Sequence, residues 1–433
     1  MPRRRKKDLM TVDIEKIIAM RRESFYSKSR LSIAMNYNRP HICQIERGER
    51  PFTPASLEAF KTVLGLEGVP ITDHEVEEYK KNELENLKDV LISDELCKAD
   101  ELIPKIANIV NLSRDEGLQL LFKLYSAVYY YMSENETAFN QTIAELKECE
   151  ANFSDVERYW WHKVLGHGAI MAGQYKTAYG EFLKCVKLKK QIKIKDKTLS
   201  VTIAYCLTYM GHSLKAIEIL KREINKRLKR FHISHSLPIK AQLAVNYINT
   251  GQAPKALKLI NKIMRESGDK VREYKLEGLF HQVLAEAYQK LGDFHNAIEN
   301  INIALERVEQ NRKVYVGYLY EKASILINFG KNSSCAKYID EGLAFYPDDE
   351  ALNGLLLNMI KHSLQMHEKD SLIYLHKVVI PNLKKRGIYL EAIKLYTRMG
   401  DFCSKNKLHK DGLIFYRHAY MISQKLWKGD FEI

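Results

Sequence analysis

The chain has 433 residues, more than one hydrophobic core usually supports, which predicts a small domain joined to a larger or repetitive one. It carries 68 Lys and Arg against 54 Asp and Glu, a net charge of +14 that favours a polyanionic partner. No run of 18 apolar residues occurs, and the basic MPRRRKK start continues into Asp8 instead of an apolar stretch. We therefore expect a cytoplasmic protein that does not enter a membrane.

The sequence contains no pattern typical of a cofactor site or a catalytic site. It has no P-loop, Rossmann glycine pattern, HExxH or nucleophile elbow. His232 and His235 are three residues apart without a third ligand near in sequence. The cysteines are odd in number and never spaced CxxC, so they suggest neither a disulfide framework nor a zinc ribbon; they lie at positions 43, 97, 149, 185, 206, 335 and 403. We expect no enzyme activity, cofactor or metal.

The first 70 residues are the most basic part, with 14 Lys and Arg against 8 Asp and Glu. An arm at 3–7, RRRKK, fits either a minor-groove contact or a disordered tail. Apolar residues at helical spacing then predict a first helix that ends near Ser24. The residues that set this spacing are Ile14, Ile17, Ile18 and Met20.

Three further short helices follow. Ser27 can cap a second helix that points Leu31, Ala34 and Met35 inward, and residues 36–38, Asn-Tyr-Asn, tolerate the left-handed backbone of a turn.

Asn38 can cap the third helix, Pro40 fits its first turn, and Gly48 ends it. A fourth amphipathic helix precedes Gly65, with Leu57, Phe60, Val63 and Leu64 on its apolar face.

Segment 14–66 resembles the helix-turn-helix domain of the phage-repressor (Cro/C1, or XRE) family, whose third helix typically ends in the Ile-Glu-Arg-Gly found at 45–48. The resemblance implies that the start of the third helix faces base edges, which assigns this role to Arg39, Pro40 and His41, with Gln44 one turn later. Arg39 suits guanine and Gln44 suits adenine, because each offers paired hydrogen-bonding groups at a matching separation. Pro40 offers only apolar contact.

Other residues of this segment fit the phosphate backbone. Lys28 stands where the family often has glutamine, and it suits a phosphate better than a base. Arg47 and Arg50 lie beyond the third helix, either beside phosphates or on solvated surface. The family pattern pairs Glu46 with Arg21 of the first helix; the alternative is an exposed ion pair that contributes little.

A Gly-x4-Ala unit recurs beyond residue 115 at intervals of 38 to 41 residues. It occurs as GQYKTA (173–178), GHSLKA (211–216), GQAPKA (251–256) and GDFHNA (292–297), with GKNSSC (330–335) as a variant. The unit resembles the tetratricopeptide repeat, most completely at 284–306. Extrapolation adds repeats near 119–150 and 393–424 and a degenerate one at 355–392.

The predicted fold is all-α, with an N-terminal helix-turn-helix bundle and a right-handed α-solenoid of about eight tetratricopeptide-like helix pairs. Each repeat is expected to stack only on its neighbours around a concave inner face. We predict a DNA-binding domain at 1–70, a helical connector at 71–115 and a repeat domain at 116–433.

This combination resembles the peptide-pheromone receptors of Gram-positive bacteria, the RRNPP family, with NprR and PlcR nearest in architecture. The resemblance implies a homodimer that binds double-stranded DNA at a palindromic operator and a short signalling peptide in the concave groove. Amide side chains suit an extended peptide backbone because they both donate and accept. By repeat phase, the residues that face the groove are Tyr205, Tyr209, Gln242, Asn249, Gln282, Glu286, Tyr320 and Asn328.

A second functional class stays open. The related Rap proteins use such repeats to hold or dephosphorylate response-regulator proteins, so a protein-sequestering module is the alternative, alone or as a second role. The N-terminal module distinguishes the two classes, because Rap-type proteins lack it.

Overall fold

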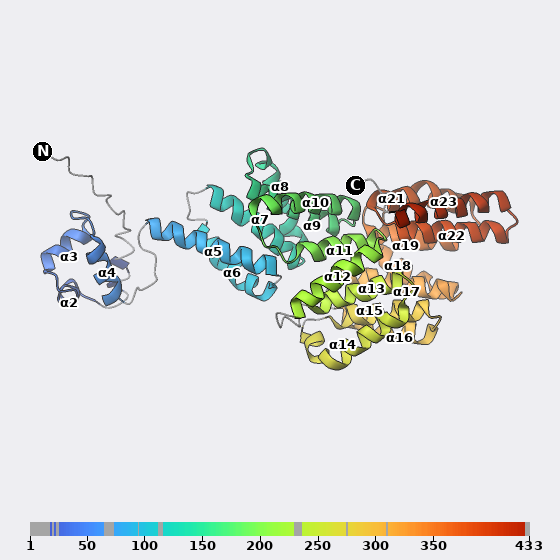
Figure 1. Ribbon diagram of the computed structural model, residues 1–433, viewed down its shortest axis with the longest axis horizontal. Helices are drawn as coiled ribbons and strands as arrows, with labels where there is room; N and C mark the ends of the chain where they lie inside the picture. Colours follow the sequence, from blue (N-terminus) through green and yellow to red (C-terminus); the bar gives the residue numbers. More distant parts are fainter. Residues whose placement is uncertain are drawn as a thin grey trace. The chain divides into compact units, whose positions relative to one another are not determined.

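The computed structural model describes residues 18–19, 21–22, 26–64, 73–93, 95–110, 116–228, 236–273, 276–308 and 311–428. Within these ranges the chain forms helices joined by turns and short loops, without a β-strand (Figure 1). The all-α prediction is confirmed. The chain divides into two compact units, Met1–Leu91 with Glu95–Tyr129 and Ile92–Asp94 with Tyr130–Ile433, and each is described by itself.

Three short helices near the N-terminus share one small core. They are α2 (Lys28–Ala34), α3 (Arg39–Glu46) and α4 (Pro54–Val63). Leu31, Ile42 and Phe60 are fully buried between them. Residues 18–19 and 21–22 are also helical, whereas the rest of the predicted first helix and the RRRKK arm lie outside the described residues.

The predicted start of α2 and both predicted ends of α3 are confirmed. The side chains of Ser27 and Asn38 accept hydrogen bonds from the first turns of α2 and α3. Asn36 and Gly48 have φ angles of 58° and 72°, the left-handed region in which asparagine and glycine are favoured. These caps and turns fix where α3 begins and ends.

The predicted inward position of Ala34 is wrong. Leu31 and Met35, four residues apart, take the inward face of α2, and Ala34 is exposed. Ser32 is buried instead, because its hydroxyl donates to the Ser29 carbonyl at 2.9 Å and so remains hydrogen-bonded.

Two helices, α5 (Asp73–Ser93) and α6 (Leu96–Val110), follow this bundle. Leu84, Leu87 and Ile106 are buried, and Lys105 pairs with Glu83 at 3.0 Å, so charge and apolar packing both join α6 to α5.

The described residues between 116 and 428 form eight helix pairs, as the repeat period predicted. The first seven first helices are α7 (Glu116–Met132), α9 (Asp155–Met171), α11 (Leu199–Tyr209), α13 (Leu237–Asn249), α15 (Glu277–Lys290), α17 (Arg312–Asn328) and α19 (Leu352–Leu364). Their second helices are α8 (Glu136–Lys147), α10 (Tyr175–Ile192), α12 (Ser213–Leu228), α14 (Ala253–Glu273), α16 (Phe294–Arg307), α18 (Ala336–Phe345), and α20 (Lys369–Tyr374) continued through a π-helical turn (Leu375–Val379) into α21 (Ile380–Arg386). The eighth pair is α22 (Tyr389–Lys405) and α23 (His409–Lys428).

The repeated Gly-x4-Ala unit forms the turn within a pair. Each of its glycines has a positive φ between 66° and 84°, which reverses the chain after the first helix. The residue five positions later, alanine in four units and Cys335 in the fifth, is fully buried, so the second helix can approach the first closely. Gly173, Gly211, Gly251, Gly292 and Gly330 are the turn glycines.

The repeat fold is as predicted, but the expectation that each repeat contacts only its neighbours is wrong. Arg386, at the end of α21, is 4% exposed and reaches the turn after α9. Its guanidinium donates to the carbonyls of Ala172 (2.7 Å), Glu350 (2.6 Å) and Asp349 (3.3 Å) and to the side chain of Asn382 (2.8 Å). The arginine therefore joins the second repeat to the seventh.

Close backbone packing surrounds this junction. A Cβ atom on Gly173 would stand 2.8 Å from the Leu352 side chain, and one on Gly387 would stand 3.0 Å from the Lys176 backbone. Figure 1 shows α21 beside α10. The repeat array thus closes through contacts between its second and seventh pairs, which a pattern of local repeats does not reveal.

Replacing Arg386 by Ala should open this closure. Three part-buried carbonyls would lose their donor, at a cost of about 1 to 3 kcal/mol in total because water can replace part of the lost hydrogen bonding. We expect faster amide hydrogen exchange at 171–176 and 349–353 in the intact protein. The control is Lys385→Ala, which removes an exposed charge from the same helix. Equal protection in both variants and the wild type would contradict the role of Arg386.

Candidate functional site

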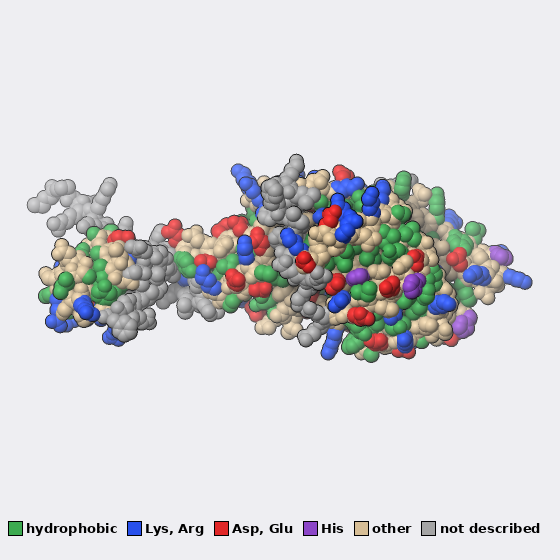
Figure 2. All heavy atoms as spheres, turned by 90° about the horizontal axis from the view of Figure 1, so that it is seen from below, with side chains coloured by type: hydrophobic (Ala, Val, Ile, Leu, Met, Phe, Trp, Pro, Cys, Tyr) green, Lys and Arg blue, Asp and Glu red, His purple; other side chains and the backbone are tan. Residues whose placement is uncertain are grey.

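The third helix presents most of its predicted DNA-binding residues to solvent. The exposed set consists of Arg39, Pro40, Gln44, Arg47 and Arg50. Figure 2 shows Lys and Arg side chains along the outer edge of the lobe formed by α2 to α4. Because Asn38 and Pro40 fix the first turn of α3, Arg39 and Gln44 project from a rigid helix.

His41 is half-buried, whereas the predicted DNA-binding residues Arg39, Pro40 and Gln44 on the same helix are exposed. Its ring stacks on Tyr37, with 4.8 Å between ring centroids. Partial burial and the nearby Arg50 charge lower the pKa of His41, so the imidazole is neutral at neutral pH. A neutral ring offers one donor and one acceptor to a base edge.

Glu46 ties α3 to the rest of the bundle. Its side chain is only 2% exposed and accepts from Arg21 at 2.5 Å, as predicted, while Lys28 lies 2.9 Å away on its other oxygen. Arg21 also donates to the Tyr26 carbonyl at 2.7 Å. The pair is buried and not an exposed ion pair, and Lys28 is held by a carboxylate instead of projecting freely.

In the repeats, the predicted tyrosines lie together on first helices. Tyr209 stacks on Tyr175 at 4.1 Å with 7° between the ring planes, and the Tyr205 hydroxyl donates to that of Tyr209 at 3.4 Å. Tyr209 remains 40% exposed. These three rings form an aromatic wall with one open side.

Acidic side chains of α15 and α17 act on Tyr209. The neighbouring Tyr205 and burial raise the pKa of Tyr209 most, and the negative charges of Glu286 and Glu321 add to this effect. The charges of Glu391 and Lys394, on α22, act in turn on Glu286. Side chains from the third, fifth, sixth and eighth pairs therefore converge on the inner face. We call Tyr209, Glu286, Glu321, Glu391 and Lys394 the inner cluster.

The carboxyls of the inner cluster differ in their partners. Burial raises the pKa of Glu286 to about 7 and that of Glu321 well above its usual value. Burial also acts on Glu391, but the Lys394 ammonium outweighs it and holds the pKa of Glu391 below its usual range. Glu286 accepts a hydrogen bond from Gln282 at 2.6 Å, whereas Glu321 has no hydrogen-bond or ion-pair partner among the described residues.

Tyr320 and Asn328 join this site through α22. The Tyr320 hydroxyl donates to Glu391 at 3.1 Å, and Arg398 donates to the Asn328 side chain at 2.7 Å.

The predicted residues of α13, Gln242 and Asn249, make no hydrogen bond to the described residues of the inner cluster. Gln242 donates to Thr208 at 3.5 Å, and Asn249 is exposed, without a hydrogen-bond partner among the described residues. Asn246, on the same helix, is fully buried and donates to Thr208 at 2.8 Å.

Sequence reasoning missed Tyr175, Asn246, Glu321 and the acidic and basic residues of α22. Asn246 lies at helical spacing between Gln242 and Asn249, a signal that could have been used. Glu391 and Lys394 belong to the inner face only because the array closes, so no local pattern points to them.

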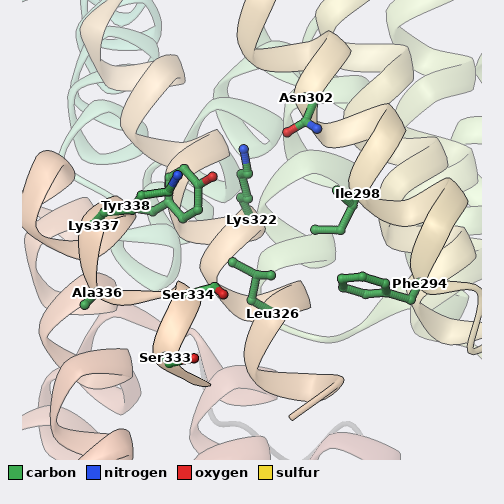
Figure 3. Close-up of a pocket in the computed structure, with 10 residues that line it drawn as sticks. All are labelled: Phe294, Ile298, Asn302, Lys322, Leu326, Ser333, Ser334, Ala336, Lys337 and Tyr338. Carbon is green, nitrogen blue, oxygen red and sulfur yellow. The ribbon is translucent and has the colours of Figure 1, made fainter. Parts of the chain in front are cut away.

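A separate depression of about 590 Å³ lies between α16, α17 and α18 (Figure 3). Phe294, Ile298 and Leu326 form its apolar side, and the Lys322 ammonium lies over the Tyr338 ring at 4.2 Å. It contains none of the residues predicted to bind peptide.

No cluster of three or more potential metal ligands occurs among the described residues, and none of their helices is long and apolar enough to cross a membrane. His232 and His235 lie outside the described residues.

The stacked helix pairs define an all-α protein of the tetratricopeptide-like repeat class. Its fold is similar to that of a Rap protein complexed with competence and sporulation factor, at a TM-score of 0.68 and 15% identity over 81% of this chain and 99% of that chain. The fold is also similar to that of NprR in complex with its cognate peptide NprX, at a TM-score of 0.68 and 19% identity over 79% of this chain and 99% of that chain. For the apo form of the quorum sensor NprR from B. thuringiensis, the TM-score is 0.55 and the identity 20%, over 80% of this chain and 99% of that chain.

At these low sequence identities the similarity concerns the fold alone. The sequence itself matches no protein-family model and no curated protein.

Replacing Glu46 by Gln should destabilise the N-terminal bundle by about 3 kcal/mol or more, because two cations lose a buried carboxylate. Faster hydrogen exchange of α2 to α4 in the intact protein would measure this. The matched control is Glu49→Gln, whose ion pair with Arg47 is exposed at 3.6 Å and is expected to contribute less than about 1 kcal/mol. Equal exchange in both variants would contradict the assignment.

Glu286→Gln should stabilise the protein at high pH. A carboxyl whose pKa is raised to about 7 contributes stability at low pH, and this is lost as the pH rises from about 4.5 through 7. We expect a gain in the free energy of unfolding of about 1 to 3 kcal/mol at pH 8 and a much smaller one at pH 5. Chemical denaturation at both pH values, with exposed Glu299→Gln as the control, measures the difference. A gain that is independent of pH would refute the burial of this charge.

Proposed function

We propose that the protein is a peptide-gated DNA-binding transcription regulator of the quorum-sensing type. The observation that carries this proposal is α3, a helix with Arg39 at its start and Gln44 one turn later, both exposed. An α-helix enters the major groove, where arginine and glutamine can each make paired hydrogen bonds with one base. We assign residues 1–70 to DNA reading, 71–115 to a connector and 116–433 to peptide binding and dimerisation.

The inner face of the repeats supplies the ligand site in this proposal. Gln282, Tyr209 and Asn328 offer donors and acceptors from three different first helices. An extended peptide of five to ten residues spans on the order of 16 to 35 Å and would bridge several such helices. The similar fold of NprR, solved with its cognate peptide NprX, supports a peptide as the ligand class.

A homodimer would complete the DNA-binding function. One small module offers few base contacts, and twofold assembly joins two half-sites of a palindromic operator. A peptide bound across the repeats would stabilise one state of the closure at Arg386. The spacing of the two modules would then depend on the peptide, and DNA affinity with it.

A protein-sequestering role is the second candidate. The similarity to the Rap protein has the same TM-score, 0.68, as the similarity to NprR, which favours neither role. The exposed face of α3 has no use in that alternative, so we prefer DNA binding.

Arg39→Ala should weaken binding to the preferred duplex by about 1 to 3 kcal/mol and relax its sequence preference, because a guanine contact is lost. Arg47→Ala, expected to remove only a phosphate contact, should weaken binding to all duplexes alike and reduce its salt dependence. The preferred duplex is first selected from a random pool with the intact protein, and affinities are then measured by fluorescence anisotropy. An equal loss on random and selected DNA for Arg39→Ala would rule out base reading by this residue.

A further inference from the structure

We propose that the cavity between α16, α17 and α18 binds a small amphipathic anion, a carboxylate or phosphate group attached to an apolar body. The acidic group of the ligand lies beside Lys322 and Lys337, and its apolar body lies against Phe294, Ile298 and Leu326. This site is separate from the inner face and does not depend on the proposed function.

The first support is a pair of cations without an acidic partner. The ammonium groups of Lys322 and Lys337 lie 4.2 and 4.6 Å from the centroid of the Tyr338 ring. Neither lysine makes an ion pair with a described residue, and none of the ten described residues that line the cavity is acidic. Glu341, one turn beyond Lys337, accepts instead from the Tyr315 hydroxyl at 2.5 Å. Two ammonium groups beside one ring repel each other, and a ligand anion offsets this repulsion and accepts charge-assisted hydrogen bonds.

The Tyr338 hydroxyl lies in the same positive potential. Burial acts to raise its pKa, but the ammonium groups of Lys322 and Lys337 outweigh burial and lower the pKa of Tyr338 below its ordinary value. Surroundings that favour a phenolate also favour a carboxylate or a phosphate. The hydroxyl can in addition donate a hydrogen bond to such a group.

Another wall of the cavity is apolar (Figure 3). Phe294 and Ile298 lie one turn apart on α16, and Leu326 of α17 is buried at the same cavity. The Phe294 ring packs on Phe329 with 5.2 Å between ring centroids, which fixes its position. The volume of about 590 Å³ is within the range of about 300 to 1,000 Å³ that is usual for small-molecule sites. Positive charge beside apolar surface fits an amphipathic ligand better than an inorganic ion.

Asn302 of α16 supplies a further polar group. Its amide oxygen is buried and has no hydrogen-bond partner among the described residues. A buried polar atom left unpaired is unfavourable, and an amide can both donate and accept. Figure 3 shows the Asn302 amide and the Lys322 ammonium at the same end of the cavity. The amide can therefore bind a second polar atom of the ligand beside its acidic group.

The cavity lies on a different side of α17 from the inner face. Tyr320 and Asn328 of α17 form hydrogen bonds with α22. Lys322 follows Tyr320 by two residues, and Leu326 precedes Asn328 by two. Two residues of an α-helix rotate the side-chain direction by roughly 200°, so Lys322 and Leu326 point nearly opposite to the residues of the inner face.

The test is a ligand-observed NMR titration of the intact protein with octanoate and with octyl phosphate. The controls are 1-octanol, which has the apolar body alone, and acetate and inorganic phosphate, which have the acidic group alone. We expect at least one octyl anion to bind about tenfold or more tightly than each of its controls, because hydrogen bonds to charged groups contribute strongly. The tighter of the two octyl anions identifies the acidic group.

Lys322→Gln and Lys337→Gln should each weaken binding of the preferred octyl anion by about tenfold. Lys337 is exposed, so its replacement leaves the fold intact. The matched control is Lys331→Gln, which removes an exposed charge from the turn before α18 but not from the cavity lining, and it should leave the affinity unchanged.

Four results would overturn the proposal. Binding of 1-octanol as tight as that of the octyl anions removes the role of charge, and equally tight binding of acetate or phosphate removes the role of the apolar wall. A loss of equal size in Lys331→Gln shows nonspecific attraction to positive charge. No binding, or an affinity unchanged in both Lys322→Gln and Lys337→Gln, removes the site and leaves the proposed function unaffected.

Discussion

The bonds from Arg386 to the carbonyls of Ala172, Asp349 and Glu350 bring distant repeats together. Without them, eight helix pairs would form an open array in which α11 and α22 are five pairs apart. With them, the first helices face one another, and the side chains of the inner cluster share one environment. The desolvation of Glu286 and Glu321 follows from this closure. Geometry between distant repeats therefore produces the electrostatics of the site.

The same closure gives a physical basis for switching. A ligand can shift an equilibrium only as far as its affinities for the two states differ. A peptide that contacts α11, α15, α17 and α22 binds better when these helices converge, and so it favours the closed array. Proton uptake by Glu286 and Glu321 reduces the cost of burying these carboxyls in the free protein and couples the closure to pH.

Local features of the fold were predictable from sequence because their causes are local. The caps Ser27 and Asn38, the turn glycines of the repeats and the Arg21–Glu46 pair all depend on short-range chemistry or on a recurring motif. Ala34 was placed on the wrong face because one turn of helix leaves the phase uncertain. Tyr205 and Tyr209 were found by repeat phase, whereas Glu391 and Lys394 required the closure at Arg386. The domain boundaries, the operator, the peptide and the dimer stay predictions.

Reciprocal linkage is the most direct test of the account. A duplex selected from a random DNA pool and a peptide recovered from a random peptide pool would be titrated separately and together by calorimetry on the intact protein. If the inner face and α3 act through one switch, peptide changes DNA affinity, and DNA changes peptide affinity by the same factor, typically about 5 to 150-fold. Two affinities that are each unaffected by the other ligand would contradict peptide-gated DNA binding.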